Sequence, residues 1–242
     1  MTKERLDKIL SNMGFGTRKE VKSLTKSGEV SVNGQIVKDS SQHVDPKKDI
    51  IEVCGEKLIY RKFIYLMMNK PSGVISATED YYEKTVVDLL DDEYIIFNPA
   101  PVGRLDKDTE GLLLLTNDGE LNHMLLSPKR HVPKKYFARI DGRVTLEDVK
   151  KFKKGVILDD GYETLPSELK IIESNEISEV EIIIYEGKYH QIKRMFEAVG
   201  KKVIYLKRLE MGPLKLDNNL KNGEYRELTE EEVKMLKEAV KR

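Results

Sequence analysis

The chain has 242 residues, 39% hydrophobic and 35% charged, so it is long enough for a packed core beneath a highly charged surface. Basic and acidic residues number 42 each, so net charge alone predicts no nucleic-acid partner, and the single cysteine excludes an internal disulfide and a cysteine-rich zinc site. Because no apolar run reaches membrane-spanning length and the N-terminus lacks a signal-peptide core, we expect a soluble, cytoplasmic protein without a membrane partner.

The N-terminal residues predict two amphipathic helices. Apolar side chains at helical spacing favour a helix over residues 3–13, which Gly14 ends. The sequence Thr17–Glu20 is a capping box, and it predicts the start of a second helix that ends at Gly28.

A small sheet should follow these helices. Val30–Val32 alternates apolar and polar residues, Asn33-Gly34 predicts a tight turn, and Ile36-Val37 forms the returning strand. Asp49–Val53 predicts a further strand. Residues 1–60 are therefore expected to form an α+β module.

Positive charge is concentrated on the predicted helices. Residues 1–38 carry eight lysines or arginines against four acidic residues, which fits either ordinary solvated helix faces or a platform for RNA phosphates. The stretches Arg5–Leu10, Thr17–Glu20 and Gly28–Gly34 resemble an S4 RNA-binding domain. That resemblance implies an RNA-binding role for Arg5, Lys8, Arg18, Lys19 and Lys22.

The next segment enters a second domain. Residues 55–63 predict a linker, and Ile64–Met68 an apolar strand that turns at Asn69–Gly73. Thr85 is placed to cap a short helix, and Ile95–Phe97 predicts a brief strand.

A charged loop then runs into four consecutive leucines within Pro101–Gly119. The leucines predict a strand buried on both faces or a short buried helical turn, so the loop is anchored to rigid core. Three interpretations fit the loop: Asp106 as a lone catalytic carboxylate beside Arg104, Asp106 and Asp108 as a metal-binding pair, or a solvated charged turn.

Two basic stretches follow the leucine strand. Pro133 indicates that residues 129–135 form a basic loop, in which Lys134 and Lys135 are placed to contact phosphate, ahead of a strand from Tyr136. Further along, Gly187–Gly200 contains a predicted helix whose first turns carry three basic residues: Lys188, Lys193 and Arg194.

The order Gly-Arg-Leu-Asp-x-Asp-Thr-x-Gly-Leu-Leu-Leu-Leu-Thr-Asn-Asp-Gly resembles the catalytic-loop motif of the RsuA-type family of ribosomal RNA pseudouridine synthases. The resemblance implies that Asp106 is the essential carboxylate and makes the metal interpretation a minor one. It implies that Lys193 is the basic partner, with Arg194 as the fallback, and that Arg104 fills the space left by a flipped base. Tyr136 is expected to stack on uracil. The resemblance also implies that Leu105, Ile192 and Arg194 border the base pocket.

The resemblance implies an S4-like α+β module at 1–60 and a catalytic domain at 61–242, with a mixed, largely antiparallel sheet flanked by helices. We expect a monomer without cofactor or metal that isomerises a specific uridine of 16S ribosomal RNA, either in the free RNA or within an assembling small subunit. A 23S ribosomal RNA target is the nearest alternative. A non-catalytic RNA-binding assembly factor is the alternative from a different class.

Overall fold

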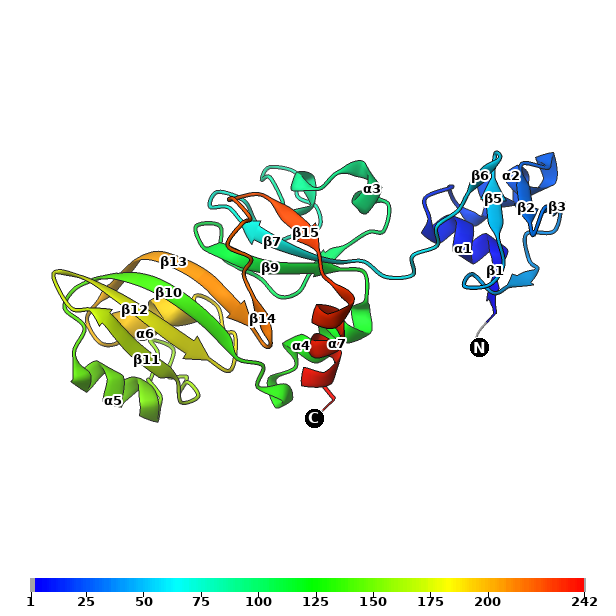
Figure 1. The fold of residues 1–242 in the computed structure, drawn as a ribbon. Helices are drawn as coiled ribbons and strands as arrows, with labels where there is room; N and C mark the ends of the chain where they lie inside the picture. The colour runs from blue at the N-terminus through cyan, green and yellow to red at the C-terminus, as the bar shows by residue number, and fades with distance from the viewer. Residues whose placement is uncertain (1–2, 242) are drawn as a thin grey trace. The chain divides into compact units, whose positions relative to one another are not determined.

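The computed structural model describes residues 3–241, which form two compact units (Figure 1). The small unit comprises residues 3–64 with Asp91–Asn98, and the large unit comprises Tyr65–Leu90 with residues 99–241. No helix of the described chain is long and apolar enough to span a lipid bilayer. Both units combine helices with mainly antiparallel strands, so the predicted α+β class is confirmed.

The small unit packs two main helices on short strands. Its elements in chain order are β1 (Glu4–Arg5), α1 (Leu6–Asn12), α2 (Arg18–Ser27), β2 (Val30–Val32), β3 (Gln35–Ile36), β4 (His43–Val44), β5 (Ile51–Val53), β6 (Glu56–Lys57) and α3 (Asp92–Ile95). Strands β3, β2, β5 and β6 form an antiparallel sheet in that order, and β1 pairs with β4. Leucine, isoleucine and valine side chains from the helices and this sheet form one core.

The local signals for α2 and the hairpin are confirmed. The Thr17 hydroxyl accepts a hydrogen bond from Glu20 N, the Glu20 carboxylate accepts one from Thr17 N, and Gly28 ends the helix at a φ of 90°. Asn33 and Gly34 join β2 to β3 with φ values of 54° and 78°, as a tight hairpin turn of this kind requires.

Three predictions for the small unit need correction. The first helix begins only at Leu6, because the residues before it pair with β4. The predicted linker 55–63 contains β6, since Cys54 and Gly55 both adopt positive φ and turn the chain back onto β5. Ile95–Phe97 is not a strand: Ile95 is the last residue of α3, and the next two residues form a turn. Acidic residues in the first turn of α3 suit a helix N-terminus.

The large unit is built on one nine-stranded sheet (Figure 1). Its strands are β7 (Tyr65–Lys70), β8 (Ala100–Pro101), β9 (Glu110–Thr116), β10 (Lys134–Asp141), β11 (Glu168–Glu173), β12 (Ile177–Ile184), β13 (Lys202–Met211), β14 (Leu214–Lys215) and β15 (Tyr225–Glu227). Its helices are α4 (Gly119–Leu126), α5 (Leu146–Lys154), α6 (Gln191–Glu197) and α7 (Glu230–Ala239), with 3₁₀ turns η1 (Val87–Leu89) and η2 (Pro128–Arg130).

The strand order along the main path is β11-β12-β10-β13-β9-β7-β15. All of these neighbours are antiparallel except β13 and β9, which are parallel, so the predicted mixed, largely antiparallel sheet is confirmed. Gly111 makes the parallel contact possible, because a Cβ atom there would lie 2.2 Å from the Arg208 carbonyl oxygen. This contact fixes the loop that precedes β9 beside β13.

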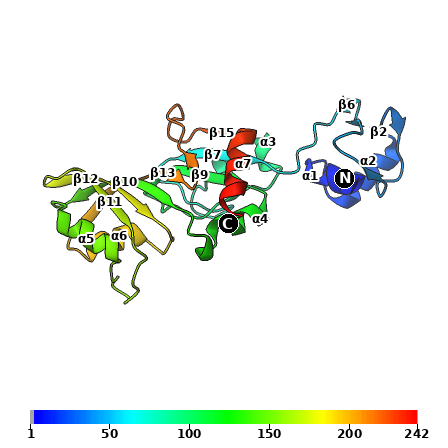
Figure 2. The same ribbon diagram turned by 60° about the horizontal axis from the view of Figure 1, so that its bottom comes forward.

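The leucines of β9 are buried on both faces of the sheet. Leu112, Leu113, Leu114 and Leu115 have no exposed surface, which confirms the interpretation as a doubly buried strand. Two of them share a core with residues of α4 and α7, while α5 contacts β11 and α6 contacts β13 (Figures 1 and 2). The loop before β9 therefore has rigid support.

Candidate active site

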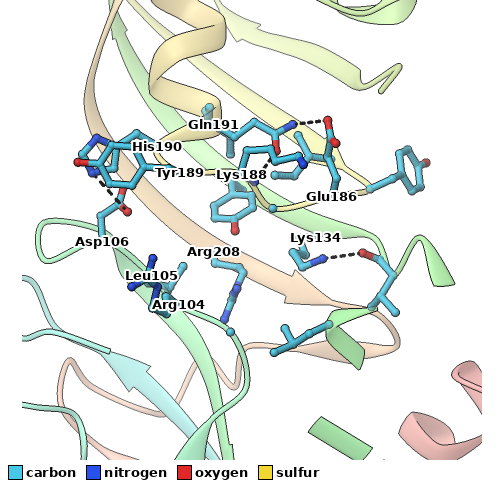
Figure 3. A pocket seen from close by; sticks show the side chains of 18 of the residues that line it. Arg104, Leu105, Asp106, Lys134, Glu186, Lys188, Tyr189, His190, Gln191 and Arg208 are labelled. Atoms are coloured by element: carbon cyan, nitrogen blue, oxygen red, sulfur yellow. Dashed lines mark hydrogen bonds and ion pairs between the residues drawn. The ribbon is translucent and has the colours of Figure 1, made fainter. Parts of the chain in front are cut away.

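A cavity of about 620 Å³ lies in the large unit (Figure 3). One wall is the loop of residues 103–109, here called the Asp106 loop, and another is the segment 184–193, which runs from the last residue of β12 into the first turn of α6. A cavity of this size accommodates a nucleotide-sized ligand.

A buried lysine holds the Asp106 loop in place. Lys70, the last residue of β7, has no exposed surface. Its Nζ donates to the backbone carbonyl oxygens of Pro71, Asp106 and Thr109 at 3.0–3.1 Å. Burial lowers the pKa of Lys70 to about 8, although nearby carboxylates, that of Asp108 foremost, oppose this change. Lys70 thus holds the loop through its backbone, so the loop side chains remain available for other contacts.

The Asp106 carboxylate lies next to two groups of the opposite wall. The Nζ of Lys193 is 3.2 Å from Asp106 Oδ2 and 2.7 Å from Asp108 Oδ1. His190 Nε2 is 3.6 Å from Asp106 Oδ1 (Figure 3). Burial opposes the charge of Lys193, yet its hydrogen bonds to Asp108 and Asp106 raise its pKa. Lys193 is therefore a cation shared by two carboxylates, and it keeps a positive charge beside Asp106.

A hydrogen-bonded junction between β12 and α6 positions Lys193. Glu186 is 8% exposed and accepts hydrogen bonds from Tyr162 Oη at 2.6 Å, Leu165 N at 2.9 Å and Gln191 Nε2 at 2.9 Å. Gln191 Oε1 in turn accepts from Lys188 N (Figure 3). These bonds fix the first residue of α6, and with it the direction of the lysine two residues later.

Apolar and aromatic side chains form part of the cavity lining. Tyr136 on β10 is 6% exposed, and Leu105 and Ile192 are buried beside it in the lining. The alternation of β10 directs Tyr136 into the cavity and its neighbour Lys135 to the other face, where Lys135 pairs with Glu181 at 3.1 Å.

Two buried cations, Arg208 and Lys134, also line the cavity (Figure 3). Arg208 Nε donates to Leu112 O at 2.7 Å, and its Nη2 is buried without a hydrogen-bond partner among the described residues. Lys134 Nζ donates to Val132 O; burial lowers the pKa of Lys134 to about 8, and Arg208 adds to this effect. Lys134 was expected in an exposed basic loop, but β10 already begins there and turns its side chain inward.

Arg194 does not line the cavity. Its guanidinium pairs with Asp159 and Asp160, with nitrogen–oxygen distances of 2.5 and 2.6 Å, so it is directed away from the Asp106 loop. The expectation that Arg194 borders the base pocket or replaces Lys193 is therefore wrong. Consecutive helical residues project about 100° apart, and only Lys193 faces Asp106.

Arg104 and Lys188 are exposed and lie at the cavity (Figure 3). The Nζ of Lys188 lies 4.5 Å from the centre of the Tyr162 ring. Their placement is compatible with contact to a ligand that enters from solvent.

In the small unit, α2 carries four exposed basic residues, the predicted phosphate contacts Arg18, Lys19 and Lys22 together with Lys26. Arg5 and Lys8 are instead engaged with acidic neighbours: Arg5 with Asp7 at 2.6 Å and Lys8 with Glu4 at 3.3 Å. Among the predicted phosphate contacts, those on α2 are therefore the better placed.

Among residues 3–241, no group of three or more histidine, cysteine, aspartate or glutamate side chains is arranged to hold a metal ion. Asp106 and Asp108 both contact the Lys193 ammonium. The arrangement of these two carboxylates is thus accounted for by a cation of the chain itself.

The sequence interpretation missed Lys70, Arg208 and Glu186. A signal exists for Lys70, since a lysine at the end of an apolar strand and before Pro71 is an unusual place for a solvated charge. Arg208 stands two residues after the buried Leu206, and strand alternation puts both on one face.

Comparisons with known proteins find matches for segments of both units. Residues 64–198 match the model of the RNA pseudouridylate synthase family, and residues 4–51 match the S4 domain. A crystal structure described as a pseudouridylate synthase superposes with a TM-score of 0.68 at 35% identity, over 96% of this chain and 99% of that one.

Three curated relatives align with almost the whole chain. A Bacillus subtilis protein described as an uncharacterized RNA pseudouridine synthase, YtzG, is 54% identical over 97% of this chain and 98% of its own length. The Vibrio cholerae ribosomal small subunit pseudouridine synthase A is 42% identical, over 95% and 97%. The Bacillus subtilis ribosomal large subunit pseudouridine synthase B is 40% identical, over 97% and 96%.

Proposed function

This chain belongs to the RNA pseudouridylate synthase family, and on that premise we propose that it converts one uridine of 16S ribosomal RNA to pseudouridine, with Asp106 as the essential carboxylate. The observation that carries the proposal is the pairing of Asp106 with the Lys193 ammonium at a cavity lined by Tyr136. A carboxylate kept beside a cation at the rim of an aromatic pocket suits chemistry at a nucleoside.

The reaction is an isomerisation. The C1′–N1 bond of uridine breaks, C1′ bonds to C5, the C5 hydrogen leaves as a proton and N1 gains a proton, so nothing is oxidised or reduced. Asp106 has two roles open to it: attack on C1′ as a nucleophile, or removal of the 2′-hydrogen as a general base. Uridine deuterated at C2′ distinguishes them, because only the second role predicts a primary isotope effect.

The lining of the cavity suits a flipped uracil. We assign the ring of Tyr136 to stacking on the base, and Leu105 and Ile192 to the apolar walls that exclude water. Arg104, exposed at the cavity, is the group proposed to occupy the space that the base leaves in the RNA.

The choice of 16S ribosomal RNA rests on residues 186–196, whose sequence Glu-Gly-Lys-Tyr-His-Gln-Ile-Lys-Arg-Met-Phe is more similar to the small-subunit branch of the family. The relatives named for the small and the large subunit are 42% and 40% identical, so a 23S target is the second candidate. Transcripts of both RNAs labelled with tritium at uridine C5 decide between them. Release from the 16S transcript alone is expected, and release from the 23S transcript alone would contradict this choice.

We propose that residues 1–60 supply RNA affinity and residues 61–242 supply catalysis. The exposed Arg18, Lys19 and Lys22 are the proposed phosphate contacts. Their joint replacement by glutamine should reduce the slope of log affinity against log salt by about 2 to 3, because each phosphate that is no longer neutralised lowers it by about 0.7–0.9. Turnover at saturating RNA should change little, and an unchanged salt slope would contradict the assignment.

A further inference from the structure

Two aromatic side chains of the large unit are fully exposed. Tyr81 and Tyr82 have relative exposures of 101% and 97%, so neither ring packs against the rest of the chain. Burial of a tyrosine removes about 150–250 Å² of surface from water, whereas these two side chains bury almost no surface and do not stabilise the core. They lie in residues 76–84, here called the tyrosine loop.

The tyrosine loop is closed and internally ordered. At its base, Ile75 N donates to Lys84 O at 3.0 Å and Val86 N donates to Ile75 O at 3.0 Å. Within it, Asp80 Oδ1 accepts hydrogen bonds from the backbone N–H groups of Tyr82 and Glu83. Because these bonds fix the backbone around the two rings, a partner would bind them with less loss of conformational entropy.

Both ends of the tyrosine loop are attached to the Asp106 loop. The Ser76 hydroxyl donates to Leu105 O at 2.9 Å and accepts from Leu105 N at 3.1 Å. At the other end, Lys107 Nζ donates to Glu83 Oε2 at 2.6 Å. Leu105 and Lys107 directly precede and follow Asp106 in the sequence. The tyrosine loop is therefore hydrogen-bonded to both sequence neighbours of the catalytic aspartate.

We propose that Tyr81 and Tyr82 stack on unpaired bases of the substrate RNA next to the target uridine. The inference rests on the proposed function, because a uridine that reaches Asp106 must leave its stack and thereby exposes the faces of its neighbours. Aromatic side chains bind such faces, and they do so with little dependence on which base is present.

The charge of the loop favours bases over phosphates as the contact. Glu79, Asp80 and Glu83 are acidic and only Lys84 is basic, so the loop as a whole does not attract the RNA backbone. Stacking on a base does not release the counterions that a phosphate contact releases. Removal of the rings should therefore weaken binding equally at low and high salt, whereas removal of a phosphate-binding cation changes the salt slope.

The first test compares the Tyr81→Ala/Tyr82→Ala double variant with a Tyr81→Phe/Tyr82→Phe variant and the wild type. The substrate is whichever of the 16S and 23S transcripts the wild type modifies, so an error in the proposed target does not affect the outcome. The alanine variant should lose 10-fold or more in kcat/KM for tritium release, with an unchanged salt slope, and the phenylalanine variant should keep most of the activity. Leu146→Ala, an exposed apolar residue on α5, is the matched control and should behave as wild type.

The second test uses the absence of tryptophan from the chain. Tyr82→Trp introduces a unique fluorophore, whose emission should be quenched by the transcript if it stacks on a base, while Leu146→Trp should not respond. Because both tyrosine rings are exposed, these variants should unfold at the wild-type temperature. Wild-type kcat/KM in the alanine variant would overturn the proposal. A loss of activity on ribosomal particles but not on the bare transcript would also overturn it, because that result would indicate contact with a protein.

Discussion

Replacing Lys70 with methionine should loosen the Asp106 loop without touching any group that contacts the substrate. Methionine has nearly the same length as lysine and is apolar, so it suits a buried position. It cannot donate to the carbonyl oxygens of Pro71, Asp106 and Thr109. Those oxygens then lack the charged donor that holds them. A displacement of about 1 Å at a catalytic group costs about 100-fold in rate, so kcat should fall strongly while RNA affinity stays unchanged.

The expected loss of stability is the difference of two terms. Each of the three short hydrogen bonds from this charged donor contributes about 1.5–3 kcal/mol, and methionine loses all three. Methionine avoids burying a charge, and the fall of the pKa of Lys70 from 10.5 to about 8 corresponds to about 3 kcal/mol of that cost. The net destabilisation is about 3 kcal/mol, which lowers the unfolding temperature by roughly 6–12 °C in a chain of this size.

Thermal unfolding followed by circular dichroism, together with tritium release, measures both effects. Lys107→Met is the matched control, because Lys107 lies in the same loop, its side chain is half exposed, and its one ion pair among residues 3–241 is with Glu83. Its replacement should cost less than about 1 kcal/mol. If Lys70→Met unfolds and turns over like the wild type, the clamp has no role in holding Asp106.

The stability of the Lys70→Met variant should also depend on pH differently from that of the wild type. Between pH 8 and 10.5, the unfolded wild type binds the Lys70 proton more tightly than the folded protein does. The wild type is therefore more stable above about pH 10.5, where Lys70 is neutral in both states, than below about pH 8, where the folded protein must bury the charge. The stability difference between wild type and Lys70→Met should widen from pH 7 to pH 10, and a difference that shrinks would contradict the assigned pKa.

Two further pairs of variants, each a test variant and its control, examine the residues that support the site. Gly111→Ala, at a φ of 102° and with its Cβ 2.2 Å from Arg208 O, should separate β9 from β13 and markedly lower the urea midpoint of unfolding, whereas Gly119→Ala, with open space around it, should not. Lys193→Met should reduce kcat for tritium release by more than 10-fold, and Arg194→Met, on the same helix, should leave it nearly unchanged; the reverse result would contradict the assignment of Lys193 as the partner of Asp106.

Features set by neighbouring residues could be predicted from the sequence. The capping box of α2 depends on Thr17 and Glu20, three positions apart, and the hairpin depends on the adjacent Asn33 and Gly34. The buried strand β9 follows from four consecutive leucines. The error at Ile95–Phe97 has a local cause as well, because an apolar run was given more weight than the acidic residues that precede it and start α3.

Features set by distant residues could not be predicted in this way. Lys70 is a charged residue in sequence, and only the fold shows that four backbone carbonyl groups surround its ammonium. The parallel pairing of β13 with β9 joins segments almost a hundred residues apart, and it alone places Arg208 beside Gly111. The preference for Lys193 over Arg194 as the partner of Asp106 came from family resemblance, because both are basic and the start of α6 at Gln191 sets the direction of each side chain.

The most direct test of the account is turnover by Asp106→Asn on the transcript that the wild type modifies. Asparagine has almost the shape of aspartate, and Asp106 is partly exposed, so the variant should fold and bind RNA with nearly wild-type affinity, because phosphate contacts dominate binding. It should release no tritium from uridine C5. Wild-type release by a folded Asp106→Asn protein would show that this carboxylate does not perform the chemistry.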